Sequence, residues 1–161
     1  MNNKKTAYLG LFAAVAIIFG YVESLFPFFV GIPGIKLGLA NLAVLFILET
    51  YTWKEAAVVS AVRIVVIGFL FGNMFTIIYS LAGAALSLFV MTLMKKSSGF
   101  SILGISVAGG VSHNIGQLMV AALIVENTSL LYYAPVLLIS GVVTGLLIGI
   151  LTKEVTKRIH L

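Results

Sequence analysis

The sequence has no cysteine and no aspartate, and only 9% of its 161 residues are charged. Without cysteine there can be no disulfide, no thiolate metal site and no cysteine nucleophile. Without aspartate there can be no Mg²⁺-diphosphate site of paired aspartates, and the chain also lacks a Gly-x-x-x-x-Gly-Lys-Ser/Thr phosphate loop. We therefore expect no catalytic residues, no cofactor and no metal site, and a protein that is not an enzyme. Any coupling to ATP hydrolysis would need another chain.

Hydrophobic residues are abundant: they make up 61% of the chain, and the mean hydropathy is +1.17. A water-soluble domain of this size could not carry that composition on its surface. The sequence predicts a polytopic, all-α membrane protein in contact with lipid, with residues 1–161 as one domain. Nothing in the sequence indicates nucleic-acid binding.

Six segments are apolar enough to suggest membrane helices, for which about 20 residues are typical. The first, residues 6–26, follows a basic N-terminus but lacks a clear small-residue cleavage site, so we expect it to be retained. Breakers rich in glycine, proline, serine or asparagine separate the segments. The other five are residues 37–51, 54–71, 74–94, 102–125 and 130–152.

The basic residues predict the orientation of these helices, because cytoplasmic loops collect lysine and arginine. If the six segments alternate in direction, eight of the ten basic residues fall on one side. Lys36 alone falls on the other side, and Arg63 lies within a span. Both termini are therefore predicted to be cytoplasmic. The outer loop of residues 27–36 is itself apolar, and it is either a lid over an outward-facing cavity or a loop resting in the membrane interface.

Polar groups concentrate in the fifth segment, within residues 109–118. At helical spacing His113 and Gln117 share a stripe, and Asn114 lies about 100° around the helix from His113. These three side chains could line a ligand site, or they could be hydrogen-bonding contacts between helices, worth about 0.6 kcal/mol each. His113 could also take part in a proton relay with Glu23 or Glu49, although nothing in the sequence establishes a carboxylate at its depth. One histidine with amides does not make a transition-metal site.

Arg63 lies near the middle of the third segment, where a charged side chain costs on the order of 3 kcal/mol or more. It could form a structural ion pair with Glu23 or Glu49. Alternatively, its guanidinium group could bind a carboxylate or phosphate of a ligand. Asn41 is predicted near the outer end of the second segment. The candidate substrate-binding residues are thus Asn41, Arg63, His113, Asn114 and Gln117.

Small residues indicate where membrane helices approach one another closely. Gly141, Gly145 and Gly149 form such a stripe on the last helix, and Thr76, Ser80, Gly83 and Ser87 form one on the fourth. The first helix carries two pairs of small residues four apart. They are used either inside the bundle or as an interface for a second membrane protein, and they are Gly10 with Ala14 and Ala16 with Gly20.

Several of these features together resemble a known family. Gly38-Leu39-Ala40-Asn41, Arg63, Ser80-Leu81-Ala82-Gly83 and His113-Asn114-Ile115-Gly116-Gln117 resemble the Gx transporter family, which is also labelled heptaprenyl diphosphate synthase component I. That family looks like the substrate-binding (S) components of energy-coupling factor transporters. The resemblance implies a six-helix bundle that binds a small solute from outside, with a transmembrane coupling protein and two cytoplasmic ATPases as partners. It also implies a multi-pass protein of the bacterial cell membrane.

One part of the family pattern is missing. S components often carry Ala-x-x-x-Ala on the first helix for the coupling protein, but here no two alanines of that helix are four apart. Gly10/Ala14 and Ala16/Gly20 could substitute sterically. The synthase label does not fit the chemistry, because the aspartates are missing.

Three functions follow as hypotheses. The first is a substrate-binding subunit for uptake of a micronutrient, a vitamin or an isoprenoid- or quinone-related precursor. The second is a non-catalytic membrane component of a quinone-linked or redox assembly. The third is proton- or ion-coupled transport without ATPase partners.

Overall fold

The computed structural model describes residues 3–25 and 38–159, and all regular secondary structure within these ranges is helical. Five helices have between 19 and 25 residues, whereas α2 has only 12. A short 3₁₀ helix, η1, precedes the last helix. The elements in chain order are α1 (Asn3–Leu25), α2 (Leu39–Thr50), α3 (Trp53–Phe71), α4 (Met74–Lys96), α5 (Ile102–Val125), η1 (Thr128–Tyr133) and α6 (Ala134–Arg158).

Polar side chains cap the starts of several helices. The side chain of Asn73 accepts from the backbone N–H of Thr76 at the start of α4, and Ser101 does the same for Gly104 at the start of α5. Gly38 precedes α2 with φ of 75°, a left-handed conformation that glycine adopts without steric cost. These caps satisfy backbone donors that would otherwise be unpaired at the helix ends.

Within the described ranges, four helical stretches are long and apolar enough to cross a membrane: α1, α4, α5 and the continuous stretch of η1 and α6. The protein is therefore membrane-embedded. The other two helices, α2 and α3, do not meet these criteria of length and composition. The 12 residues of α2 rise only about 18 Å, well short of the ~30 Å hydrocarbon core of a bilayer. Helix α3 has 19 residues, but they include Lys54, Glu55 and Arg63. That all six helices span the membrane stays a prediction.

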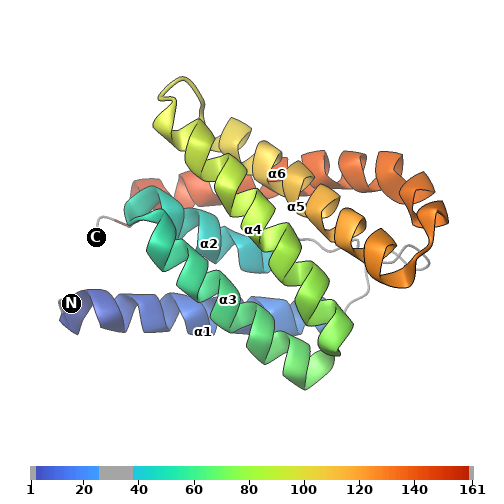
Figure 1. Cartoon of the computed structure of the whole chain (residues 1–161). Coiled ribbons are helices and arrows are strands. Elements are labelled where there is room, and N and C mark those ends of the chain that lie inside the picture. Colours follow the sequence, from blue (N-terminus) through green and yellow to red (C-terminus); the bar gives the residue numbers. More distant parts are fainter. Residues whose placement is uncertain (1–2, 26–37, 160–161) are drawn as a thin grey trace.

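The N-terminal end of α1 and the C-terminal end of α6 lie at the same end of the bundle (Figure 1). We call this the basic end, because Lys5, Lys54, Lys95 and Lys157 lie there. The opposite end is the far end. An even number of alternating helices brings the start of α1 and the end of α6 together in this way. The cytoplasmic orientation of this end stays a prediction.

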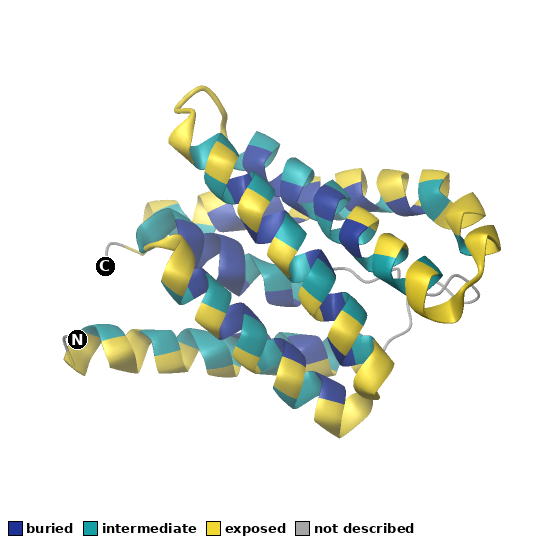
Figure 2. Ribbon diagram, in the orientation of Figure 1, coloured by how far each residue is buried: buried dark blue, intermediate teal, exposed yellow. Residues whose placement is uncertain are grey.

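Helix α2 forms the centre of the core. Its residues from Ala43 to Leu48 are at most 4% exposed, and Figure 2 shows it as the most continuously buried helix. It packs against α1, α3 and α6. The outer sides of the other helices are exposed (Figure 2), and many of their exposed residues are large and hydrophobic. A short helix can thus be this apolar because protein rather than lipid surrounds it.

Helix α5 is held tightly between α4 and α6 by glycines. A Cβ atom added to Gly110 would lie 2.5 Å from the backbone oxygen of Gly141, and one added to Gly83 would lie 2.7 Å from the backbone oxygen of His113. Helices can approach this closely only where a residue has no side chain. Such packing stabilises helix association in a membrane, because lipid provides no hydrophobic driving force between helices. The predicted glycine stripe of the last helix is therefore used within the bundle. These contacts fix the rotation of α5, and with it the direction of the polar groups at its middle.

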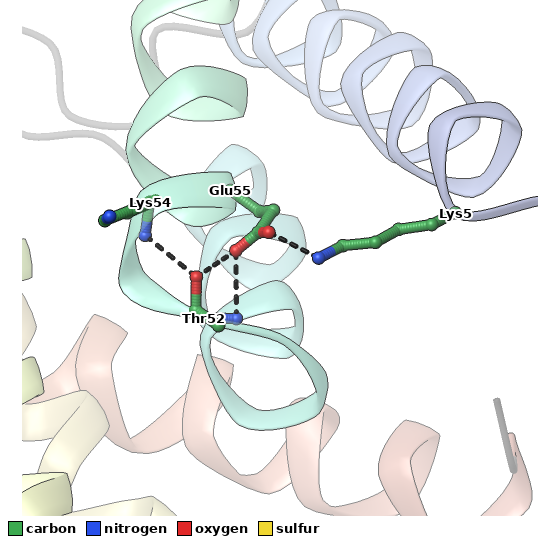
Figure 3. Close-up of polar contacts among 4 residues, drawn as sticks. All are labelled: Lys5, Thr52, Lys54 and Glu55. Carbon is green, nitrogen blue, oxygen red and sulfur yellow. Dashed lines mark hydrogen bonds and ion pairs between the residues drawn. The ribbon is translucent and has the colours of Figure 1, made fainter. Parts of the chain in front are cut away.

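Ion pairs hold the basic end together. Lys5 of α1 pairs with Glu55 of α3, which also completes a capping box with Thr52 (Figure 3). The ammonium of Lys5 also lies 5.4 Å from the ring centroid of Tyr51. These contacts fix the start of α3 against α1.

Candidate functional site

All five residues predicted to bind substrate line one cavity inside the bundle. Its volume, counted as the space open to the centres of water-sized molecules, is about 120 Å³. That is enough for several water molecules or a small solute, since one water needs roughly 10–15 Å³ on this measure. All six α-helices contribute to the walls. The predicted residues are Asn41 of α2, Arg63 of α3, and His113, Asn114 and Gln117 of α5.

Arg63 and Asn41 meet across the cavity wall. The Nη2 atom of Arg63 donates a hydrogen bond of 3.0 Å to Oδ1 of Asn41. The Nε atom of Arg63 is buried and makes no hydrogen bond with any described residue. A buried donor on a charged group normally has a partner, because leaving it unsatisfied costs about 1–3 kcal/mol or more. Arg63 thus brings to the cavity wall a charged group with one donor that has no partner among the described residues.

Glu23 adds a carboxylate to the same cavity. Its Oε1 atom accepts a hydrogen bond of 2.8 Å from the backbone N–H of Leu39, so it caps the start of α2. Its negative charge also acts on Arg63. The N-terminal end of α2 carries the positive end of a helix dipole, which partly offsets the Glu23 charge. The cavity thus combines a guanidinium group, a helix N-terminus and one carboxylate that is already engaged.

The second proposed counter-ion for Arg63, Glu49, lies elsewhere. Its Oε2 atom is 3.7 Å from Nζ of Lys95, near the basic end. The same ammonium group donates a 3.1 Å hydrogen bond to the backbone oxygen of Glu49. Glu49 and Lys95 therefore join α2 to α4, and the alternative that pairs Glu49 with Arg63 is wrong.

The polar side chains of α5 differ in how strongly hydrogen bonds restrain them. Asn114 Nδ2 donates a hydrogen bond of 2.7 Å to the backbone oxygen of Leu137 and so ties α5 to α6. Gln117 Nε2 lies 3.5 Å from Oγ of Ser80, at the limit of a hydrogen bond. Asn114 thus acts in part as a contact between helices, whereas Gln117 is held weakly. His113 also lines the cavity.

A smaller cavity of about 30 Å³ continues toward the basic end. The two share Asn41, His113 and Thr144, together with Gly38 and Gly110. Its walls are mainly apolar but include three serines, one each from α3, α4 and α5, that are at most 6% exposed. They are Ser60, Ser87 and Ser106. The site is therefore a polar chamber with a narrow inner extension.

Sequence reasoning missed several residues of the cavity. Thr76 and Ser80 were interpreted only as packing residues of α4, although both line the cavity. Nothing in the sequence distinguished Thr144 of α6, because a single threonine in an apolar helix commonly donates a hydrogen bond to the backbone of the same helix. Here its hydroxyl donates to the backbone oxygen of Ser140 at 2.9 Å. The proposed lid, residues 27–36, lies outside the described residues. Within residues 3–25 and 38–159 there is no group of three or more metal-ligating histidine or acidic residues.

The small residues of α1 divide into two sets. Ala16 is fully buried, and a Cβ on Gly20 would lie 3.0 Å from Cγ1 of Ile67 in α3. These two pack against the chain's own helices and are not available to a partner in this structure. Gly10 and Ala14 are exposed, and a Cβ on Gly10 would meet nothing within 4 Å. An interface role stays a prediction for this exposed pair.

The fold and cavity define a membrane-embedded helical protein with a polar cavity between its helices. Residues 12–155 match the family described as heptaprenyl diphosphate synthase component I. The match covers most of the chain, which therefore belongs to this family, as the resemblance predicted. Comparisons with curated proteins and with solved structures found no match.

Proposed function

We propose that the chain is the substrate-binding subunit of an energy-coupling-factor-type importer in a bacterial cell membrane. The observation that carries this proposal is the convergence of all five predicted residues on one cavity, with Arg63 Nε buried and unpartnered among the described residues. The substrate is a small micronutrient, a vitamin or an isoprenoid- or quinone-related precursor that carries an anionic group. Its carboxylate or phosphate binds the guanidinium fork of Arg63.

Transport requires partners that the chain does not contain. In this proposal a transmembrane coupling protein and two cytoplasmic ATPases supply the energy. The coupling protein docks on the exposed small residues of α1, Gly10 and Ala14, because small side chains permit close helix approach. Both chain ends face the cytoplasm, where basic residues collect. The chain itself binds substrate and is not an enzyme.

The binding step can be tested by native mass spectrometry of protein purified in mild detergent. Wild-type protein is expected to retain a small molecule that organic extraction releases. Arg63→Gln should lose it, whereas the matched control Lys153→Gln, at an exposed position on α6, should retain it. A wild-type protein that is empty and gains no stability from phosphate, carboxylates or a vitamin panel contradicts the proposal.

The partner step needs a separate test. A tagged chain should copurify with the coupling protein and ATPases from its own cells. Gly10→Leu and Ala14→Leu should abolish this association, while Ala85→Leu, on the exposed face of α4, should not. Association that survives both α1 variants contradicts this interface.

A second candidate function is a non-transporting membrane component of a quinone-linked or redox assembly. The hydrogen bond from Asn114 to Leu137 favours it, because this polar group holds two helices together. The family's own description as a synthase component also favours a multi-chain assembly. In that case Arg63→Gln and His113→Ala should reduce stability without a separable loss of binding.

A further inference from the structure

A third cavity lies beside the polar chamber, toward the far end of the bundle. Its volume is about 130 Å³ on the same measure. Residues from α4, α5, η1 and α6 form its walls, and none of the described lining residues is charged. They are Tyr79, Asn114, Gln117, Leu118, Ala121, Leu130, Tyr133 and Leu137.

Asn114 and Gln117 belong to both cavities, so their side chains form the boundary between them. Asn114 is fixed by its 2.7 Å hydrogen bond to α6. Among the described residues, the one hydrogen bond of the Gln117 side chain is its 3.5 Å contact with Ser80, which is at the limit of a hydrogen bond. Of the two residues at this boundary, Gln117 is therefore the less restrained.

The two cavities differ in chemistry. The polar chamber contains Arg63, Asn41 and Glu23, whereas the third cavity presents aliphatic side chains and the rings of Tyr79 and Tyr133. An ionised group would be costly in the third cavity, because no described lining residue could neutralise it. An apolar group gains free energy there when it leaves water.

We propose that the third cavity, hereafter the side pocket, binds the apolar part of an amphipathic anion whose charged group lies at Arg63. This inference rests on the proposed function and narrows its substrate class. The anionic group contacts Arg63 beside Asn41, and the apolar group extends past Gln117 toward Leu118 and Ala121. The side pocket sets how long or bulky that apolar group can be.

The test uses two series of probes with the full chain in lipid nanodiscs. The first is inorganic phosphate with methyl, butyl and hexyl phosphate, and the second is acetate, butyrate and hexanoate. Affinity in at least one series should rise by up to about fourfold per added methylene until the pocket is full. Hexanol and hexylamine, which lack the anionic group, should bind far more weakly. Arg63→Gln should abolish the binding of every anion.

Two variants test whether the apolar group of the probe binds in the side pocket. Ala121→Phe and Leu118→Trp place bulk in the side pocket, and each should remove the gain with chain length while leaving the affinity for phosphate or acetate unchanged. The matched control Ala85→Phe adds the same bulk to the exposed face of α4 and should keep the gain. Thermal unfolding shows which variants are folded. The test needs only one of the two pocket variants to be folded.

The outcomes separate the inference from the proposed function. If short anions bind through Arg63 without any gain from chain length, the inference fails and the proposed function stands. A gain that persists in the folded pocket variants also overturns the inference. If hexanol binds as well as hexyl phosphate and hexanoate, and independently of Arg63, the side pocket is a lipid site and the inference fails. If no anion binds in an Arg63-dependent way, both fail.

Discussion

Arg63 and Asn41, which are 22 residues apart in the sequence, meet through a 3.0 Å hydrogen bond from Nη2 to Oδ1. The bond occupies one edge of the guanidinium group, while Nε is buried and unpartnered within the described part of the chain. Asn41 thus orients the arginine without neutralising its charge. An amide is suited to this role, because a carboxylate in its place would compete with an anionic ligand.

This relationship predicts opposite effects of a charge change on stability and on binding. Asn41→Asp would place a carboxylate against the guanidinium group, so thermal stability should be unchanged or higher. Affinity for an anion should fall by about tenfold or more, since hydrogen bonds to charged groups are worth roughly 1.5–3 kcal/mol. Titration with the copurified ligand or with phosphate measures the affinity. An undiminished affinity would show that Arg63 does not bind the anion.

Asn114 and Gln117 should respond differently to truncation. Asn114→Ala removes the bond to the Leu137 oxygen and should lower the unfolding free energy by about 0.6–1.7 kcal/mol, the range for polar contacts between membrane helices. Gln117→Ala should change stability less, because its contact with Ser80 is already 3.5 Å long. Thermal unfolding in one detergent compares the two variants. Equal losses would contradict the different restraint seen here.

A matched pair of glycine substitutions tests the packing of α5 against α6. Gly110→Ala places a Cβ atom 2.5 Å from the Gly141 oxygen, and the resulting separation of helices should cost about 1–3 kcal/mol. Gly10→Ala meets nothing within 4 Å and should be neutral, or stabilising by up to about 1 kcal/mol. Urea or thermal unfolding measures both. A tolerated Gly110→Ala would mean that α5 and α6 separate easily.

The ion pair of Lys5 and Glu55 should contribute modestly to the packing of α1 on α3. The two side chains are 32% and 19% exposed, so solvent screens part of their attraction. A double-mutant cycle with Lys5→Met and Glu55→Gln should give a coupling free energy of about 0.5–1 kcal/mol that declines as salt is added. No coupling at low salt would indicate that other contacts hold the basic end.

Much of the fold could be predicted because its signals are local. Hydropathy runs indicated six helices, and Asn73 and Ser101 stand where α4 and α5 begin. The nature of α2 was harder to predict. Its hydropathy resembles that of a membrane helix, but its 12 residues are buried by other helices. Composition alone does not distinguish a side chain in contact with lipid from one in contact with protein.

The sequence predicted part of the cavity. It indicated five of the polar lining residues but not Thr76, Ser80 and Thr144, and it did not predict the contacts among them. Polar groups in apolar helices are costly, and that cost pointed to Arg63 and to the His113, Asn114 and Gln117 group. No pattern in the sequence distinguishes Glu23 from Glu49 as the neighbour of Arg63. That choice depends on how the helices are rotated about their axes, which close glycine contacts and caps determine together.

By itself the sequence determined that this protein is helical and membrane-embedded, because hydropathy and helix caps act within one segment. It also identified the polar side chains that lie in apolar helices and therefore need a hydrogen-bond partner or a cavity. Only the tertiary structure decided that Asn41 holds Arg63, that Glu23 caps α2, that Glu49 pairs with Lys95, and that Ala16 and Gly20 are buried inside the bundle. These contacts join residues far apart in the chain, and they depend on helix rotation and close approach, which no single segment encodes.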